Sequence, residues 1–278
     1  MAARTNLNAT RVKPEDARLL TLRVHRTEQV SPSFMRLTLT GADMEHFTFM
    51  GFDQWFRLFI PVSETSLGRL PNKLDTLAYL KYLAIAKTER PVLRNYTVRS
   101  YRADGPEGSE LDVDFVLHGS AADGTSGPAA SWAQTCAPGT AVAILDEGIQ
   151  YNPPASAGRR TVLVADETGL PAAAGILESL PRDAVGTAVL EVPHGDDVQS
   201  IDAPIGVDVV WVPREGAHAT PGAAALRVAS GLLVGDEPFY GWVVGEQSLP
   251  VAMRRHWVAA GVPKDHIAFS GYWKAGKH

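Results

Sequence analysis

The sequence contains very little cysteine: Cys136 is the only one among 278 residues. A single cysteine excludes a disulfide within the chain and a zinc or iron–sulfur site built from cysteine ligands. Scarce cysteine is typical of proteins from a reducing compartment. The eight histidines show no spacing typical of metal ligands, so we expect no protein-bound metal.

Long apolar runs are also absent. No stretch approaches the roughly 18 apolar residues that a transmembrane helix needs, and residues 1–20 contain no apolar segment of a secretory signal. The formal net charge of −5 argues against sequence-independent nucleic-acid binding, which depends on basic surface. We therefore expect a cytoplasmic protein, taken as a monomer, with no stable membrane insertion and no nucleic-acid partner.

The length of 278 residues predicts two domains. The first half predicts six β-strands, each with β-branched or aromatic residues in partial alternation: "LLTLRVHRTEQ", "FMRLTLTG", "DQWFRLFIP", "RNYTVRSYR", "ELDVDFVLHG" and "GTAVAILDE". Residues 62–91 interrupt them with the helical pattern "LDTLAYLKYLAIA", whose role the sequence leaves open. Short strands in series predict an antiparallel β-barrel or a β-sandwich.

In the second half, predicted strands alternate with predicted helices, from "RRTVLVAD" to the last strand "HIAFSGYW". This alternation indicates βαβ units and a parallel sheet. The Pro- and Gly-rich stretch "YNPPASAGRR" suggests the boundary, so we predict domains of residues 1–152 and 153–278. The expected fold class is α+β with two domains.

The stretch "RNYTVRSYR" carries three arginines in nine positions. Arg94 and Tyr96 share one face of a strand there, and Thr97 points to the other side. An arginine, a tyrosine and a threonine placed in this way could bind the pyrophosphate, the flat ring and a ring nitrogen of a flavin dinucleotide. A solvated edge strand explains the same residues, so the stretch alone leaves both interpretations open.

A Gly-rich loop follows "DFVLHG" and ends at a predicted helix that begins with Pro128. The N–H groups of such a loop and helix start can bind a phosphate, and Ser131 adds a hydroxyl. An ordinary surface loop explains this segment equally well.

Taken in order, several motifs resemble the siderophore-interacting proteins, which are FAD-dependent ferric-siderophore reductases of the ferredoxin reductase-like superfamily. The motifs span most of the chain: "DQWFRLFIP", "RNYTVR", "DVDFVLHG…GPAASWA", "ADETGLPA", "VVGEQSLPVAMRRHW" and "SGYWKAG". The resemblance implies an N-terminal six-stranded antiparallel FAD barrel and a C-terminal α/β NAD(P)H domain. It implies that FAD contacts the following residues, with Tyr96 and Thr97 on the N5 side of the flavin: Arg94, Tyr96, Thr97, His118, Gly119, Gly127, Ala129, Ala130 and Ser131.

For the nicotinamide nucleotide, the resemblance implies a second set at "ADETGLPA" and "VVGE": Asp166, Glu167, Thr168, Gly169, Gly245 and Glu246. Asp166 and Glu167 are equally well explained as helix caps. The fingerprint G-x-G-x-x-G is absent. Asp196 and Asp197 favour NADH, whereas Arg214 favours NADPH, so the donor stays open.

The resemblance implies hydride transfer from NAD(P)H to FAD, then single-electron reduction of a ferric siderophore with release of ferrous iron. Arg57, Lys274 and Lys277 are the candidate contacts to an anionic siderophore. Ordinary surface charge also explains each of them. One alternative is an NAD(P)H:flavin electron-transfer reductase that serves another acceptor. Another is a flavin- or siderophore-binding module without catalysis.

Overall fold

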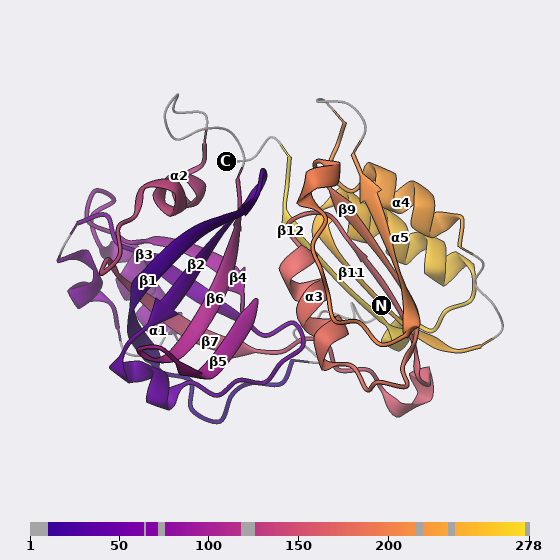
Figure 1. Ribbon diagram of the computed structural model, residues 1–278, viewed down its shortest axis with the longest axis horizontal. Helices are drawn as coiled ribbons and strands as arrows, with labels where there is room; N and C mark the ends of the chain where they lie inside the picture. Colours follow the sequence, from indigo (N-terminus) through magenta and orange to yellow (C-terminus); the bar gives the residue numbers. More distant parts are fainter. Residues whose placement is uncertain are drawn as a thin grey trace. The chain divides into compact units, whose positions relative to one another are not determined.

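The computed structural model describes residues 11–63, 65–71, 76–117, 126–214, 219–232 and 237–275. The chain divides into two compact units. One unit comprises residues 13–50 and 54–148, and is called here the barrel unit. The other, the α/β unit, comprises residues 1–12, 51–53 and 149–278. Figure 1 shows the mostly antiparallel strands of the first unit and the layered sheet and helices of the second.

The barrel unit is built on one antiparallel sheet of seven strands in the order β4-β3-β7-β1-β2-β6-β5. Their bounds are β1 Leu19–Ser31, β2 Phe34–Thr40, β3 Trp55–Ile60, β4 Val92–Thr97, β5 Ser100–Gly105, β6 Gly108–Val116 and β7 Ala141–Gly148. The sequence predicted six strands, because "RNYTVRSYR" was interpreted as a single strand. In the structure this stretch forms parts of β4 and β5.

The break between β4 and β5 joins the two ends of the sheet. The N–H of Val98 donates to the carbonyl of Gln54, beside β3, at 2.8 Å. The next N–H, of Arg99, donates to the carbonyl of Asp112 in β6 at 2.9 Å. The chain thus leaves one edge of the sheet and joins the other within two residues, so the sheet curls into a barrel.

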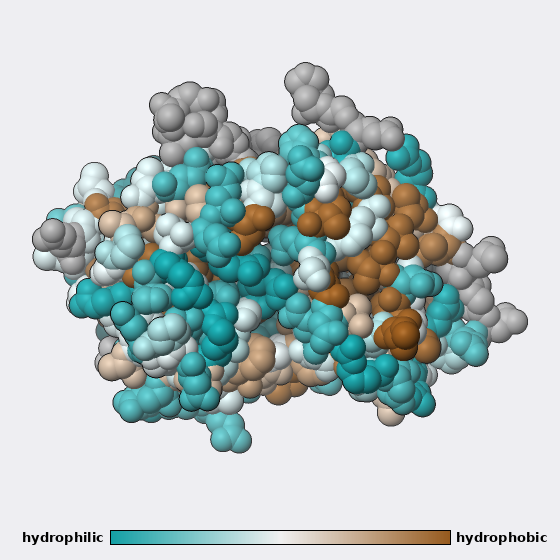
Figure 2. All heavy atoms as spheres, in the orientation of Figure 1, coloured by the Kyte–Doolittle hydropathy of each residue, from teal (hydrophilic) through white to brown (hydrophobic). Residues whose placement is uncertain are grey.

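Period-two alternation along β6 separates the inside of this barrel from its outside. Leu111, Val113 and Phe115 are buried in the apolar core, and Glu110, Asp112 and Asp114 point the other way. Four arginines, from β1, β2, β5 and the break before β5, lie close to these carboxylates: Arg26, Arg36, Arg102 and Arg99. The face of the barrel over β1, β2 and β6 is largely hydrophilic in Figure 2, as this charged ladder requires.

Two helices accompany the barrel. Helix α2, Pro128–Thr135, contacts β2, β4 and β6. Its Trp132 packs on the barrel core, 5.9 Å from the ring of Phe115. Helix α1, Thr76–Ala84, lies in the 62–91 segment as predicted, and Tyr82 at its end packs in a small second core with Phe59. A short 3₁₀ helix, η2, spans Ala42–His46, and another, η3, spans Ser66–Arg69.

The α/β unit contains a parallel five-stranded sheet in the order β10-β9-β8-β11-β12. The strands are β8 Arg160–Ala165, β9 Val185–Val192, β10 Gly206–Pro213, β11 Phe239–Glu246 and β12 Ile267–Trp273. The strand order reverses direction between β8 and β11, which makes this position the topological switch point. All five strands were predicted from the sequence.

Three helices cover this sheet. Helix α3, Leu170–Ser179, lies on one face, and α4, Ala223–Ser230, and α5, Ser248–Ala259, lie on the other (Figure 1). Valines of β8, β9 and β11 pack with α4 and α5 in one apolar cluster. The short 3₁₀ helices η4, η5 and η6 span Ala155–Ala157, Gly195–Asp197 and Lys264–His266. Within the described ranges, no helix is long and apolar enough to cross a membrane.

Exposed apolar side chains gather at the outer part of this sheet. Figure 2 shows hydrophobic atoms over the region of β9 and β10. Ile205, just before β10, is fully exposed, and Val185 at the start of β9 is 44% exposed.

Candidate functional site

Strand β4 presents the three residues that the sequence singled out. Arg94 is exposed, and its guanidinium donates to the carbonyl of Leu93 at 2.9 Å. Within the described residues no carboxylate pairs with it. The ring of Tyr96 lies 4.2 Å from that of Phe115, and burial raises the pKa of its hydroxyl, whereas nearby Arg94 lowers it. Thr97 is 8% exposed. The strand therefore offers one uncompensated cation beside a half-buried aromatic ring.

Helix α2, which contacts β4, has an open N-terminus. Gly127 precedes Pro128 as an extended N-cap residue without a side-chain cap. The N–H of Ser131 donates to the carbonyl of Gly127 at 2.8 Å, so the N–H groups of Ala129 and Ala130 precede the first helical bond and have no acceptor within the helix. A Cβ added at Gly127 would meet nothing within 4 Å.

These two features fit a dinucleotide with a pyrophosphate and a flat ring. An uncapped helix N-terminus favours an anion through its N–H groups and its dipole, and an unpaired arginine adds a charge-assisted bond. The hydroxyl of Ser131 is 2.8 Å from that of Ser126, so it is fixed at the helix start. The predicted contacts His118 and Gly119 lie outside the described residues.

The switch point of the parallel sheet is organised by Asp166, which is fully buried. One carboxylate oxygen accepts the N–H of Thr168 at 2.9 Å and its hydroxyl at 2.5 Å. The other accepts the N–H of Glu246 at 2.6 Å and the indole N–H of Trp273 at 3.3 Å. Asp166 thus joins its own turn to β11 and β12. Neither its carboxylate nor that of Glu167 caps α3, which has no side-chain cap.

Two glycines permit close packing around Asp166. Gly245 has a φ of +137°, and a Cβ there would lie 2.6 Å from the Cγ of Asp166. At Gly169 a Cβ would lie 2.4 Å from a methyl group of Val244. Glycine at 169 therefore serves the packing of the turn against β11.

Glu246 is a second structural carboxylate at this edge. It accepts the N–H and hydroxyl of Ser248 at 2.6 and 2.5 Å, and the N–H of Ala275 at 3.2 Å. Burial raises the pKa of Glu246, but these hydrogen bonds together lower it by more, so the net shift of the pKa is downward. Glu246 therefore holds the start of α5 and the segment after β12.

A buried ion triad lies further along the same edge. Arg214, directly after β10, contacts Glu167 at 2.5 Å and Glu191 of β9 at 3.2 Å. Glu191 also accepts the N–H groups of Gly222 and Ala225 at 2.8 and 2.9 Å, which caps α4. Sequence reasoning missed Glu191, although a glutamate inside the apolar run "TAVLEVPH" is a signal for it. Burial and Asp166 raise the pKa of Glu167 to about 7, against the opposing effect of Arg214.

The three cations predicted to contact the acceptor have different surroundings. Arg57 pairs with Glu147 of β7 at 2.7 Å, so its charge is compensated. Lys274 is exposed, and no carboxylate of the described residues pairs with it. Lys277 lies outside the described residues.

Cys136, at the end of α2, packs against the barrel core. Burial raises the pKa of its thiol to about 11, which disfavours the nucleophilic thiolate at neutral pH.

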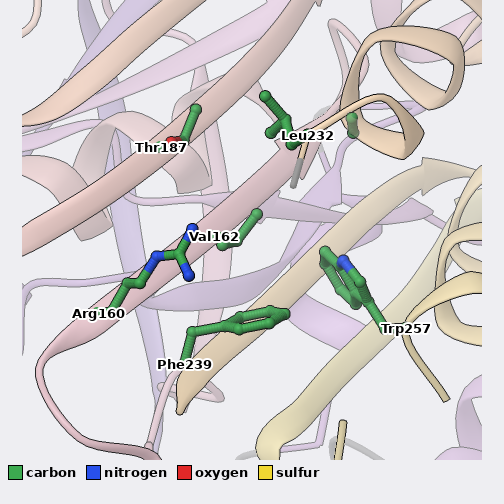
Figure 3. Close-up of a pocket in the computed structure, with 7 residues that line it drawn as sticks. Arg160, Val162, Thr187, Leu232, Phe239 and Trp257 are labelled. Atoms are coloured by element: carbon green, nitrogen blue, oxygen red, sulfur yellow. The ribbon is translucent and has the colours of Figure 1, made fainter. Parts of the chain in front are cut away.

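A small hollow in the α/β unit is unsuited to the site. It is lined by residues from the amino halves of β8, β9 and β11, where the guanidinium of Arg160 lies over Phe239 at 5.6 Å (Figure 3). Its volume of about 10 Å³ holds about one water. Ligands of open α/β sheets bind at the opposite, carboxyl ends of the strands.

Known families account for both units. A model described as the siderophore-interacting FAD-binding domain matches residues 23–151, and one described as siderophore-interacting protein matches residues 158–276. With the barrel and the parallel sheet, they define an FAD-containing oxidoreductase with a nicotinamide-binding half. The predicted fold, FAD and NAD(P)H are thereby confirmed.

The chain belongs to the siderophore-interacting protein family, as its motifs indicated. It is 31% identical to a siderophore utilization protein from T. fusca, with a TM-score of 0.78 over 97% of each chain. It is 29% identical to the ferric vibriobactin reductase ViuB of Vibrio cholerae over 91% of this chain and 88% of that protein. It is 27% identical to the NADPH-dependent ferric-chelate reductase of Escherichia coli over 94% of both chains.

Proposed function

We propose that the protein reduces ferric siderophores with electrons from NAD(P)H and so releases ferrous iron. The observation that carries this proposal is the uncapped N-terminus of α2 beside β4, where Arg94 is exposed and unpaired among the described residues. That arrangement suits an FAD pyrophosphate. The names of the relatives from V. cholerae and E. coli, a ferric vibriobactin reductase and a ferric-chelate reductase, support ferric chelates as the acceptor.

When bound, FAD would accept two electrons from the nicotinamide donor and pass them on one at a time to the acceptors. Each NAD(P)H carries two electrons, so one turnover reduces two ferric complexes. Hard oxygen ligands hold Fe(III) more tightly than Fe(II), and reduction therefore loosens the metal. The iron is substrate, and no residue of the chain has to ligate it.

In this proposal, the residues of the barrel unit hold and orient the flavin. Arg94 and the N–H groups of Ala129 and Ala130 bind the pyrophosphate, with Gly127 leaving room and Ser131 supporting the helix start. Tyr96 packs on the ring. Thr97 lies on its N5 side. His118 and Gly119 complete the predicted contacts to ribose and phosphate.

The carboxyl ends of the strands of the parallel sheet are called here the nucleotide edge. Residues of the α/β unit around the switch point shape this edge. Thr168 is the half-exposed residue of the turn after β8 and is a direct contact in this proposal. Asp166, Glu167, Gly169, Gly245 and Glu246 fix the backbone around it through the bonds described above. Lys274 is the primary cation for an anionic siderophore, with Arg57 and Lys277 as further candidates.

We further propose domains of residues 1–152 and 153–278, and a monomer in the cytoplasm. The two family matches, which end at residue 151 and begin at residue 158, support the boundary. The single cysteine supports a reducing compartment.

The proposal is tested with the flavin-loaded protein under anaerobic conditions. We expect the visible flavin band to bleach with a nicotinamide donor and to return when a ferric hydroxamate or catecholate is added, with formation of Fe(II). The acceptor should be used faster than a one-electron dye of matched potential. Reoxidation by protein acceptors alone would identify an electron-transfer reductase, and absence of bleaching would leave a binding module.

A further inference from the structure

We infer that the protein uses NADH in preference to NADPH, because the segments that follow β9 and β10 contain no lysine or arginine free to bind a 2′-phosphate. This inference rests on the proposed function and specifies its electron donor. The two donors differ only at the adenosine ribose, which carries a hydroxyl in NADH and a phosphate in NADPH. An acidic side chain favours the first and an arginine or lysine the second.

The candidate cation on this stretch, Arg214, already pairs with two buried carboxyl groups. It contacts Glu167 at 2.5 Å and Glu191 at 3.2 Å. These carboxyl groups are 1% and 0% exposed, so turning the guanidinium toward a phosphate would leave both buried groups without their partner. Glu191 also caps α4 through Gly222 and Ala225. Moving Arg214 would therefore disturb the packing of β8, β9 and α4 together.

No other lysine or arginine is available on this stretch of the chain. From Pro193 to Gly222, which includes the segments after β9 and β10, Arg214 is the sole lysine or arginine. The same stretch carries Asp196 and Asp197 in η5, directly after β9. A phosphate with two negative charges is disfavoured beside these carboxylates.

Asp196 is placed to accept a bond from the 2′-hydroxyl of NADH. In sheets of this strand order, the residue after the second strand faces the adenosine ribose. Here the second strand is β9, and η5 follows it. Asp197 is buried and accepts the N–H of His194 at 3.1 Å as a cap. Asp196 in the same turn is exposed and has no described partner.

The test isolates the ribose phosphate from the redox reaction. Calorimetric titration of the flavin-loaded protein compares adenosine 5′-monophosphate with adenosine 2′,5′-bisphosphate. We expect the monophosphate to bind at least about ten-fold more tightly. Replacing Asp196 with arginine (Asp196→Arg) should reverse the order. The matched control, Asp208→Arg, makes the same change of charge in the amino half of β10 and should leave the order unchanged.

Flavin bleaching with NADH and NADPH provides the second readout, and NADH should give the higher kcat/KM. Tighter binding of the bisphosphate, or an unchanged order in Asp196→Arg, would overturn the inference. If NADH is preferred but ferric siderophores do not reoxidise the flavin, the proposed function fails and the donor assignment stands.

Discussion

The carboxylate of Asp166 accepts the backbone N–H of Glu246 at 2.6 Å. The two residues are 80 positions apart in the chain, and they join the ends of β8 and β11 at the switch point. The contact requires glycine at the preceding position, because a Cβ at Gly245 would lie 2.6 Å from the Cγ of Asp166. The backbone at the ends of β8 and β11 is therefore held in place by the buried carboxylate of Asp166, which needs a glycine at position 245.

Replacing Gly245 with alanine tests this relationship. The φ of +137° disfavours any side chain, and the collision with Asp166 adds a cost from overpacking, so we expect a loss of about 3 to 5 kcal/mol in the free energy of unfolding. Urea denaturation measures it. Gly261→Ala is the control, because Gly261 has a φ of +90° but nothing within 4 Å of its added Cβ. It should cost about 1 to 2 kcal/mol. Equal losses in both variants would show that the contact with Asp166 is unimportant.

The ladder of charges on the barrel allows a second prediction. Arg102 contacts Glu110 at 2.8 Å and Asp112 at 2.6 Å, and both carboxylates are nearly buried. Because Arg102 itself is partly exposed, we expect Arg102→Gln to cost about 1 to 2 kcal/mol of stability. The control, Arg69→Gln, breaks an exposed pair with Glu89 and should cost less than about 0.5 kcal/mol.

The same ladder predicts how this cost depends on pH. Burial raises the pKa values of Glu110 and Asp112, but the arginines outweigh it, so both values lie below normal. A carboxylate with a lowered pKa stabilises the fold above its unfolded pKa and loses that contribution as pH falls through its folded pKa. The difference between parent and Arg102→Gln should therefore shrink as the pH falls below about 5. A constant difference would contradict the ladder as its source.

How much of this arrangement the sequence could predict depends on the range of the contacts. Every strand and helix of the α/β unit was predicted, because each is a local pattern of apolar residues. The stretch "RNYTVRSYR" was only half explained as a cofactor-binding strand. Arg94 fits that role, whereas Arg102 and Arg99 lie beside carboxylates of β6. The alternation of acidic and apolar residues in "ELDVDF" was the signal for that ladder.

The contacts of the nucleotide edge are harder to predict. Asp166 and Glu246, or Arg214 and Glu191, come together only when the strand order is known, since no local pattern pairs them. For this reason the sequence left Asp166 open between a cap and a cofactor contact, and Arg214 open as a phosphate-binding residue. The direct cofactor contacts predicted at both units stay predictions.

Glu167 gives a third prediction, with the opposite dependence on pH. Its pKa is raised from 4.5 to about 7, chiefly by burial. A buried acid with a raised pKa stabilises the fold while protonated and loses that contribution as pH rises from about 4.5 through 7. Glu167→Gln lacks this change, so its stability relative to the parent should rise by roughly 2 to 3 kcal/mol between pH 5 and pH 8. Denaturation at several pH values measures it. A difference between Glu167→Gln and the parent that stays constant over this pH range would contradict the prediction.

The last prediction concerns flavin retention. Arg94 is exposed, lacks a described carboxylate partner and lies in β4, which α2 contacts. Arg94→Ala should therefore fold normally but bind FAD roughly ten-fold or more weakly, since a charge-assisted phosphate bond is lost. Arg23→Ala is the matched control. Arg23 is an exposed arginine of the same barrel, and it also donates to a backbone carbonyl, that of Gly139, at 3.1 Å. Fluorescence titration of the apoprotein with FAD measures both variants. Equal affinity in the two would exclude Arg94 from the pyrophosphate site, while circular dichroism confirms that each is folded.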